Sequence, residues 1–215
     1  MKIKRQKQAR HLLSMYKNSF RIQEPFQVLI DGTFAQAAYK NKVFIEDQLS
    51  KYLSCSLRCF TTKCVLAELS LLGSEMRGAK AIIQKFQTKP CSHDDSPTSA
   101  VKCLKSLIGD KNEHGYFIAT QDANLTKLAR SIPGIPVLYI YQMSIILDKP
   151  SKATSNFVKD LSSDKIRMPA EQKASLLAMK KEANIIIPQK RKPVKRKGPK
   201  GPNPLSVKKK KKKGN

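Results

Sequence analysis

Three acidic residues stand where an α/β enzyme could hold a catalytic metal ion: Asp31, Glu68 and Asp122. Asp31 ends the apolar segment FQVLI, Asp122 follows the segment YFIAT, and Glu68 lies in a helical pattern after LRCFTT. Ligands bind at the carboxyl ends of parallel strands, so the three carboxylates are expected to converge. Carboxylates bind Mg²⁺ or Mn²⁺, which activate water and stabilise the transition state of phosphodiester cleavage. A single acid at such a turn is more often a helix cap, so the hypothesis rests on the combination.

A second group of residues has the chemistry of a zinc site. Its members are Cys64, Cys91, His93 and Cys103. Three thiolates and one imidazole can form a closed tetrahedral site of the structural type. Cys64 lies 27 residues before Cys91, which is not the spacing of a short zinc finger, so spacing alone leaves ordinary buried cysteines as an equal alternative. Cys55 and Cys59 are a possible rival pair, interpreted as half-buried residues beside a strand.

The elements that must position these residues alternate along the chain. Short apolar runs predict strands over 26–30, 57–62, 115–120 and 135–142. Helical spacing predicts helices over 34–40, 43–54, 63–73, 75–88, 100–109 and 122–132, and the polar stretch 89–99 shows no periodicity. This alternation predicts an α/β fold with a mainly parallel sheet covered by helices on both faces.

The charge of the chain points to a polyanionic partner. The 215 residues carry a formal charge of +26, and residues 165–215 hold 18 basic residues against two acids. Clustered lysines of this kind favour nucleic acid or nuclear targeting over a merely solvated charge run. The candidate RNA-binding residues are Lys2, Lys4, Arg5, Lys7, Arg10, Lys190, Arg191, Lys192, Lys195, Arg196, Lys197, Lys208, Lys209 and Lys210.

The two ends of the chain differ from its middle. Residues 1–22 form a basic arm, part of which could be an amphipathic helix packed on the domain or on RNA. Apolar density falls after Asp148, residues 168–187 are expected to hold one more helix, and disorder is predicted from Pro188 onward. The segment GPNPLS could present Leu205 to a partner or be a linker. No apolar segment is long enough to span a bilayer and no secretory signal is recognised, so an intracellular protein is expected.

Several motifs together resemble the PIN-domain family, in the branch that acts in the small-subunit processome of eukaryotic ribosome assembly. The motifs are LIDGT, TTKCVLAELSLLG, PCSH, YFIATQDANL and IPGIPVLYI, and the resemblance covers nearly the whole chain. It implies a three-layer PIN-like domain over 23–160 with an embedded Cys-Cys-His-Cys zinc site, preceded by the arm 1–22 and followed by a basic, largely disordered tail over 161–215. It also implies a location in the nucleus and nucleolus.

The chain departs from the pattern of an active member of that family, in which about four acids are expected. Asp31, Glu68 and Asp122 match three of them. At the other positions Val101 and Lys102 replace acids, and Asn124 replaces the second acid of the pattern T-x-D-x-D-L. A lysine repels a divalent cation, and asparagine binds it more weakly than a carboxylate does. The acids are therefore expected to be vestigial, although the nearby Asp94 and Asp95 could in principle contribute.

The function expected from these observations is that of a non-catalytic RNA-binding assembly factor. Its partners would be pre-rRNA, small nucleolar RNA (snoRNA) and other processome proteins, with no membrane or small-molecule substrate. Structural zinc is the expected cofactor, and Mg²⁺ or Mn²⁺ is not expected. Two alternatives remain: a metal-dependent endoribonuclease with a reduced acidic site, and a protein-interaction scaffold whose charge serves targeting only.

Overall fold

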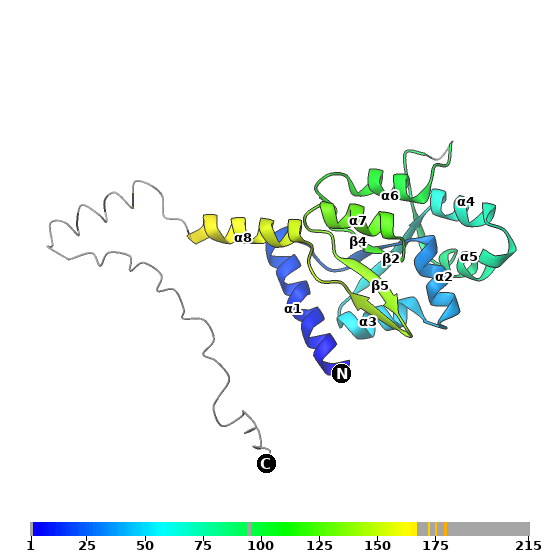
Figure 1. Ribbon diagram of the computed structural model, residues 1–215, viewed down its shortest axis with the longest axis horizontal. Coiled ribbons are helices and arrows are strands. Elements are labelled where there is room, and N and C mark those ends of the chain that lie inside the picture. Colours follow the sequence, from blue (N-terminus) through cyan, green and yellow to red (C-terminus); the bar gives the residue numbers. More distant parts are fainter. Residues whose placement is uncertain (1, 94–95, 167–171, 173–174, 176–178, 180–215) are drawn as a thin grey trace, which may run out of the picture. The chain divides into compact units, whose positions relative to one another are not determined.

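A six-stranded sheet with the strand order β3-β2-β1-β4-β5-β6 forms the centre of the domain (Figure 1). The computed structural model describes residues 2–93 and 96–166, together with 172, 175 and 179. The strands are β1 (Phe26–Ile30), β2 (Leu57–Thr62), β3 (Gln87–Lys89), β4 (Phe117–Ala119), β5 (Val137–Tyr141) and β6 (Ser144–Leu147). The part of the chain up to Ile166 is one unit, to which the fold described below belongs.

The sheet is parallel except at one edge. Val28 of β1 lies opposite Cys59 of β2 on one side and Phe117 of β4 on the other. Only β6, among the strands in the described residues, runs antiparallel, and it pairs with β5. The central strands are almost entirely buried, as their continuous apolar runs require when helices cover both faces.

Helices cover the two faces of this sheet. They are α1 (Lys2–Phe20), α2 (Gly32–Lys40), α3 (Ile45–Leu53), α4 (Lys63–Leu71), α5 (Arg77–Ile83, after a 3-10 turn over Ser74–Met76), α6 (Ala100–Ile108), α7 (Ala123–Ser131) and α8 (Lys152–Ile166). Figure 1 shows α6 and α7 on one side of the sheet and α1, α2 and α3 on the other. The predicted α/β fold with a mainly parallel sheet is confirmed. In the described residues no helix is both long and apolar enough to cross a bilayer.

Residues 87–88 were predicted as the end of a helix, and this was wrong. Helix α5 ends at Ile83, and Gln87 and Thr88 belong to β3, where they pair with Phe60 and Thr61 of β2. The segment QTK is polar and has no alternating pattern, and its residues Gln87 and Thr88 are exposed, so its strand conformation depends on the neighbouring strand. The elements β6 and α8 were not expected from the sequence at all.

Residues 1–22 contain a helix that packs into the domain. In α1 the side chains of Ala9, Leu13 and Tyr16 lie on one face and belong to the hydrophobic core. The basic residues Lys4, Arg5, Lys7 and Arg10 of the same helix are exposed. Helix α8 extends to Ile166, beyond the expected domain boundary at 160. The helix expected over 168–187 and the predicted disorder of the tail concern segments that lie outside the described residues.

Candidate metal centre and acidic site

Asp31 is buried at the carboxyl end of β1, with only 4% of its surface exposed. The hydroxyls of Thr33 and Thr120 both donate to its Oδ2 atom, Thr120 at 2.9 Å. The same hydroxyls accept hydrogen bonds from the backbone N–H groups of Gln121 and Asp122, each at 3.0 Å. The Asp31 carboxylate is therefore part of a closed network that joins the ends of β1 and β4.

Burial raises the pKa of Asp31, and the hydrogen bonds from Thr33, Thr120 and the backbone N–H groups of Gly32 and Thr33 offset only part of that effect. A raised pKa means that the folded chain holds this proton more tightly than the unfolded chain does. The contribution of Asp31 to stability is thus largest at acid pH and decreases as the pH rises through the raised pKa.

We expect this decrease to disappear in Asp31→Asn. The free energy of unfolding of the wild type, measured relative to Asp31→Asn by urea denaturation, should fall between pH 4 and 7, by no more than about 1.4 kcal/mol per pH unit for one proton. Asp160→Asn, which removes an exposed carboxylate from α8, serves as the control and should show no such trend. A wild type that gains stability relative to Asp31→Asn as pH rises would contradict the assignment.

The other two predicted acids serve as helix caps. Asp122 is the N-cap of α7, and its two carboxylate oxygens accept the N–H groups of Asn124 and Leu125, both at 3.1 Å. Glu68 is exposed on α4, and its Oε2 atom accepts the N–H group of Ala100, the first residue of α6, at 2.7 Å. Such bonds satisfy backbone donors that a helix leaves unpaired at its N-terminus.

The residues that replace the expected acids lie near these caps. Lys102 is exposed on α6, Val101 packs against the core, and Asn124 is exposed in the first turn of α7. Within the described part of the chain, the three acids do not form a group of ligand atoms close enough to share one ion. Asp94 and Asp95 lie outside the described residues.

The four predicted zinc ligands do meet. The ligand atoms of Cys64, Cys91, His93 and Cys103 all lie within 4.8 Å of one another. The Sγ atoms of Cys64 and Cys91 are 3.9 Å apart, close to the roughly 3.8 Å that separates two thiolates on a tetrahedral zinc with Zn–S bonds of about 2.3 Å. This separation is far longer than a disulfide bond of about 2.05 Å, and no disulfide joins cysteines in the described residues.

The surroundings of the cluster fit a bound ion. The Nδ1 atom of His93 is buried and has no hydrogen-bond partner among the described residues. The thiol of Cys103 donates to the hydroxyl of Thr62 at 3.5 Å, and burial together with the neighbouring thiols raises its pKa to about 12. A cation at the centre would replace the thiol protons and give His93 a partner, so the residues present fit a metal ion.

The cluster joins segments that are distant in the sequence. Cys64 lies in the first turn of α4 and Cys103 in α6, and both are buried, whereas Cys91 and His93 lie half-buried in the loop between β3 and α6. The donor set is that of structural zinc sites. An ion here would attach this loop to both helices.

Cys55 and Cys59, the rival pair, lie outside the cluster. Cys59 is buried in β2, where burial raises the pKa of its thiol to about 12, and burial raises the pKa of the half-buried Cys55 to about 11. In the described residues, neither cysteine belongs to the group whose ligand atoms lie close enough to share one ion.

Three threonines were not identified as site residues from the sequence. Thr33 and Thr120 hold the Asp31 carboxylate, and the hydroxyl of Thr62 accepts from both Cys103 and the N–H of Val65. Thr120 is the threonine of the T-x-D motif, so the motif could have identified it as a site residue, but only the acid of the motif was interpreted.

Comparisons with known proteins show which class of protein this chain resembles. A solved structure described as the PIN domain endonuclease Utp24 is similar to this chain, with a TM-score of 0.53 and 31% identity over 59% of this chain and 94% of that one. Residues 51–149 match the family model described as Fcf1, and residues 193–212 match the model described as UTP23 sensor motif. The fold is thus that of a PIN domain.

Two relatives define the family within that class. The rRNA-processing protein utp23 of Schizosaccharomyces pombe is 32% identical over 97% of this chain and 88% of its own length. The rRNA-processing protein FCF1 of Saccharomyces cerevisiae is 32% identical over 60% of this chain and 67% of its own length. The chain belongs to the Fcf1/Utp23 family of PIN-domain proteins.

Proposed function

We propose that this protein is a non-catalytic PIN-like RNA-binding factor of early small-subunit ribosome assembly. It would bind pre-rRNA or snoRNA in the nucleolus, beside other proteins of the small-subunit processome. Its relatives are named as rRNA-processing proteins, and its tail matches the UTP23 sensor motif over 193–212, which supports the proposal. Zinc in the Cys/His cluster would have a structural role.

One observation carries the non-catalytic assignment: each of the three predicted acids accepts hydrogen bonds from other groups of the fold. Asp31 accepts two hydroxyls, Asp122 accepts two N–H groups of α7, and Glu68 accepts the first N–H of α6. A catalytic Mg²⁺ or Mn²⁺ would have to compete with these bonds for the carboxylates. Because acids are also missing at positions 101, 102 and 124, too few ligands remain to hold it.

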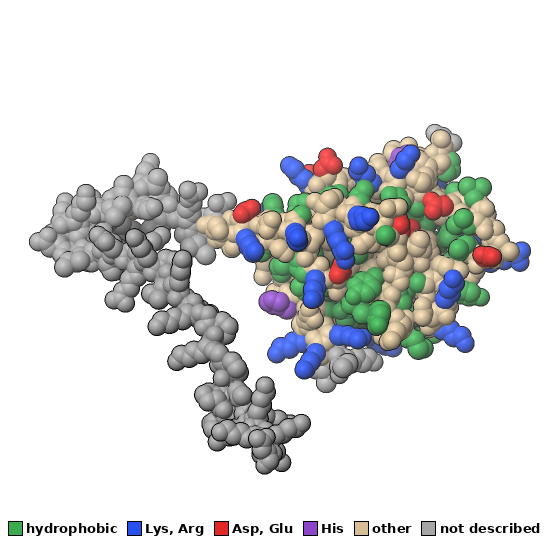
Figure 2. Space-filling view, in the orientation of Figure 1, with side chains coloured by type: hydrophobic (Ala, Val, Ile, Leu, Met, Phe, Trp, Pro, Cys, Tyr) green, Lys and Arg blue, Asp and Glu red, His purple; other side chains and the backbone are tan. Residues whose placement is uncertain are grey.

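The proposed RNA surface begins with α1. Because Ala9, Leu13 and Tyr16 anchor this helix, its basic residues face solvent in a fixed arrangement. Figure 2 shows Lys and Arg side chains gathered over α1 and α8 on one face of the domain. The side chain of Lys2 and the tail candidates from Lys190 to Lys210 lie outside the described residues and stay predictions.

One assay tests binding and cleavage together. Labelled structured pre-rRNA is incubated with Mn²⁺ and either the wild type or Asp31→Asn, and retention and fragments are read from the same tube. We expect both proteins to retain the RNA equally and to produce no fragments, because the site lacks the ligands that a catalytic ion needs. The PIN domain endonuclease Utp24 is the positive control for cleavage.

A second candidate function is metal-dependent endoribonuclease activity. The similarity to a PIN domain endonuclease and the presence of Asp31, Glu68 and Asp122 favour it. Fragments that disappear with Asp31→Asn would establish this activity and overturn the non-catalytic assignment.

A further inference from the structure

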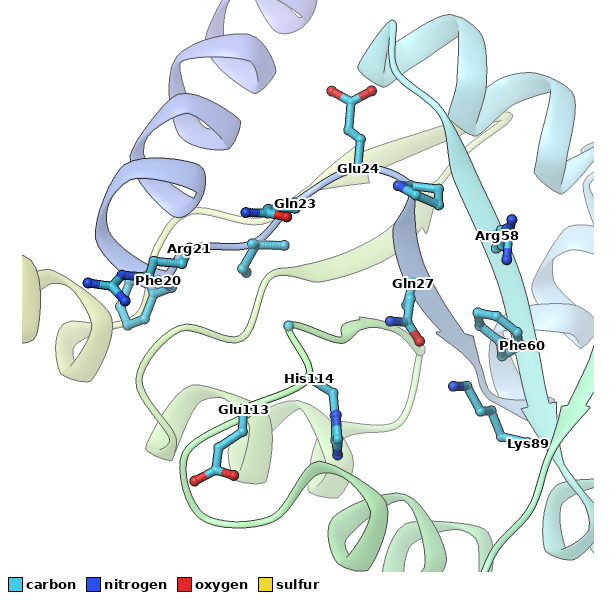
Figure 3. Close-up of a pocket in the computed structure, with 13 residues that line it drawn as sticks. Phe20, Arg21, Gln23, Glu24, Gln27, Arg58, Phe60, Lys89, Glu113 and His114 are labelled. Carbon is cyan, nitrogen blue, oxygen red and sulfur yellow. The ribbon is translucent and has the colours of Figure 1, made fainter.

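A hollow of about 440 Å³ opens beside the amino-terminal ends of β1 and β2, at the opposite end of these strands from Asp31 (Figure 3). Its walls are the segment 20–25, which follows α1, and the turn 113–115, which precedes β4. The strands contribute Gln27, Arg58, Phe60 and Lys89. This hollow belongs neither to the acidic network nor to the Cys/His cluster.

The cations around the hollow lack acidic partners in the part of the chain that the structure describes. Arg21, Arg58 and Lys89 form no ion pair with any described residue. Of the two acids in the lining, Glu24 is bound by Lys17 at 2.6 Å, which lowers its pKa, and it also accepts from the N–H and the hydroxyl of Ser56. Figure 3 shows the carboxylates of Glu24 and Glu113 turned away from the hollow. The hollow is therefore positively charged.

Lys89 lies against two aromatic rings. Its Nζ atom lies 4.8 Å from the ring centroid of Phe60 and 5.6 Å from that of Tyr116. Cation–π contacts of this kind orient an ammonium group without supplying a counter-ion. Figure 3 shows the amino group of Lys89 directed toward Gln27.

Gln27 adds a polar group between the cations. It is half-buried in β1 and lies opposite Arg58 of β2 in the sheet register, so the two side chains leave the same face of the sheet. An amide offers both a donor and an acceptor, as the edge of a nucleobase does. The phosphate-binding and base-binding groups are thus within one hollow.

We propose that this hollow binds one nucleotide of single-stranded RNA, with the phosphate held by Arg58 and Lys89 and the base edge by Gln27. The inference rests on the proposed RNA-binding function and adds a contact at the far end of the sheet from the acidic edge. A volume of about 440 Å³ lies in the usual range of about 300–1,000 Å³ for ligand pockets. Single-stranded RNA is recognised by this combination of phosphate contacts and groups for an unpaired base.

The test is fluorescence anisotropy of a labelled single-stranded RNA of about 12 nucleotides, with the full chain at several salt concentrations. The double variant Arg58→Gln/Lys89→Gln should bind about tenfold more weakly, and the slope of log K against log salt should become shallower by about 1.4, the value for two lost contacts to a single strand. Lys105→Gln/Lys127→Gln, which removes two exposed cations from α6 and α7, is the matched control and should change affinity by less than about twofold. Gln27→Ala, which keeps the charge, should weaken binding with an unchanged slope.

The outcomes separate this inference from the function on which it rests. If the pocket variant binds RNA as tightly as the wild type, or if the control variant weakens binding equally, the proposed pocket is overturned. The RNA-binding function would still stand. Absence of wild-type binding to the short single strand would overturn the pocket alone, and absence of binding to structured pre-rRNA as well would overturn both. Inorganic phosphate at constant ionic strength should not displace the RNA, and full displacement would identify a free-phosphate site instead. Thermal unfolding of each variant confirms that it is folded.

Discussion

Replacing Cys91 with serine is expected to remove zinc from the protein and to lower its free energy of unfolding by at least about 3 kcal/mol. The purified wild type should contain about one equivalent of zinc by elemental analysis, and Cys91→Ser less than about a tenth. The reason is that a zinc ion bound by the four residues would attach the loop between β3 and α6 to Cys64 and Cys103. The melting temperature should fall by about 10 °C, and a strong chelator should lower that of the wild type similarly.

Cys55→Ser is the matched control for this experiment. Cys55 and Cys91 are both half-buried, but Cys55 lies outside the cluster. Its replacement should leave the zinc content unchanged and alter the melting temperature by no more than about 2 °C. A zinc content below about a tenth of an equivalent in the wild type, with the same content in Cys91→Ser, would contradict a zinc site at these residues.

The second large effect concerns the docking of α1. Tyr16 is 2% exposed, and Tyr16→Ala is expected to lower the free energy of unfolding by about 3–5 kcal/mol, because it removes a large side chain from the core and leaves a cavity. Urea denaturation at constant pH measures the change. The exposed basic residues of α1 should also lose their fixed arrangement, so RNA affinity should decrease at a temperature where the variant remains folded.

Ser14→Ala tests whether the effect belongs to the buried face of α1. Ser14 is exposed on the same helix two residues away, and its replacement should change stability by no more than about 0.5 kcal/mol. If Tyr16→Ala costs less than about 1 kcal/mol, residues 1–22 act as the detached basic arm that charge and composition alone would allow.

Local patterns were sufficient to predict the main secondary structure. The apolar runs FQVLI and LRCFTT became β1 and β2, and the helix predicted over 100–109 became α6 and ends before Gly109. Periodicity and capping residues act over a few neighbours, so one segment carries enough information to identify such elements. The short strand β3 could not be found in this way, because it owes its conformation to β2.

For the two sites as well, the sequence indicated some features and the tertiary structure decided others. Residue types and spacing left a zinc site and ordinary buried cysteines as equal alternatives for Cys64, Cys91, His93 and Cys103, and the resemblance to the PIN family favoured zinc. The missing acids at 101, 102 and 124 were likewise recognised only against the pattern of that family, and they predict a weak nuclease site. What the remaining acids do was decided by tertiary structure, since Glu68 bonds to Ala100, 32 residues away, and Asp31 to Thr120, 89 residues away. The hollow beside Gln27 could likewise not be predicted from the sequence, because the segments that line it are brought together only by the folded sheet. Residue type and local spacing determine which chemistry is available, whereas hydrogen-bond partners and cavities depend on long-range packing that no local pattern encodes.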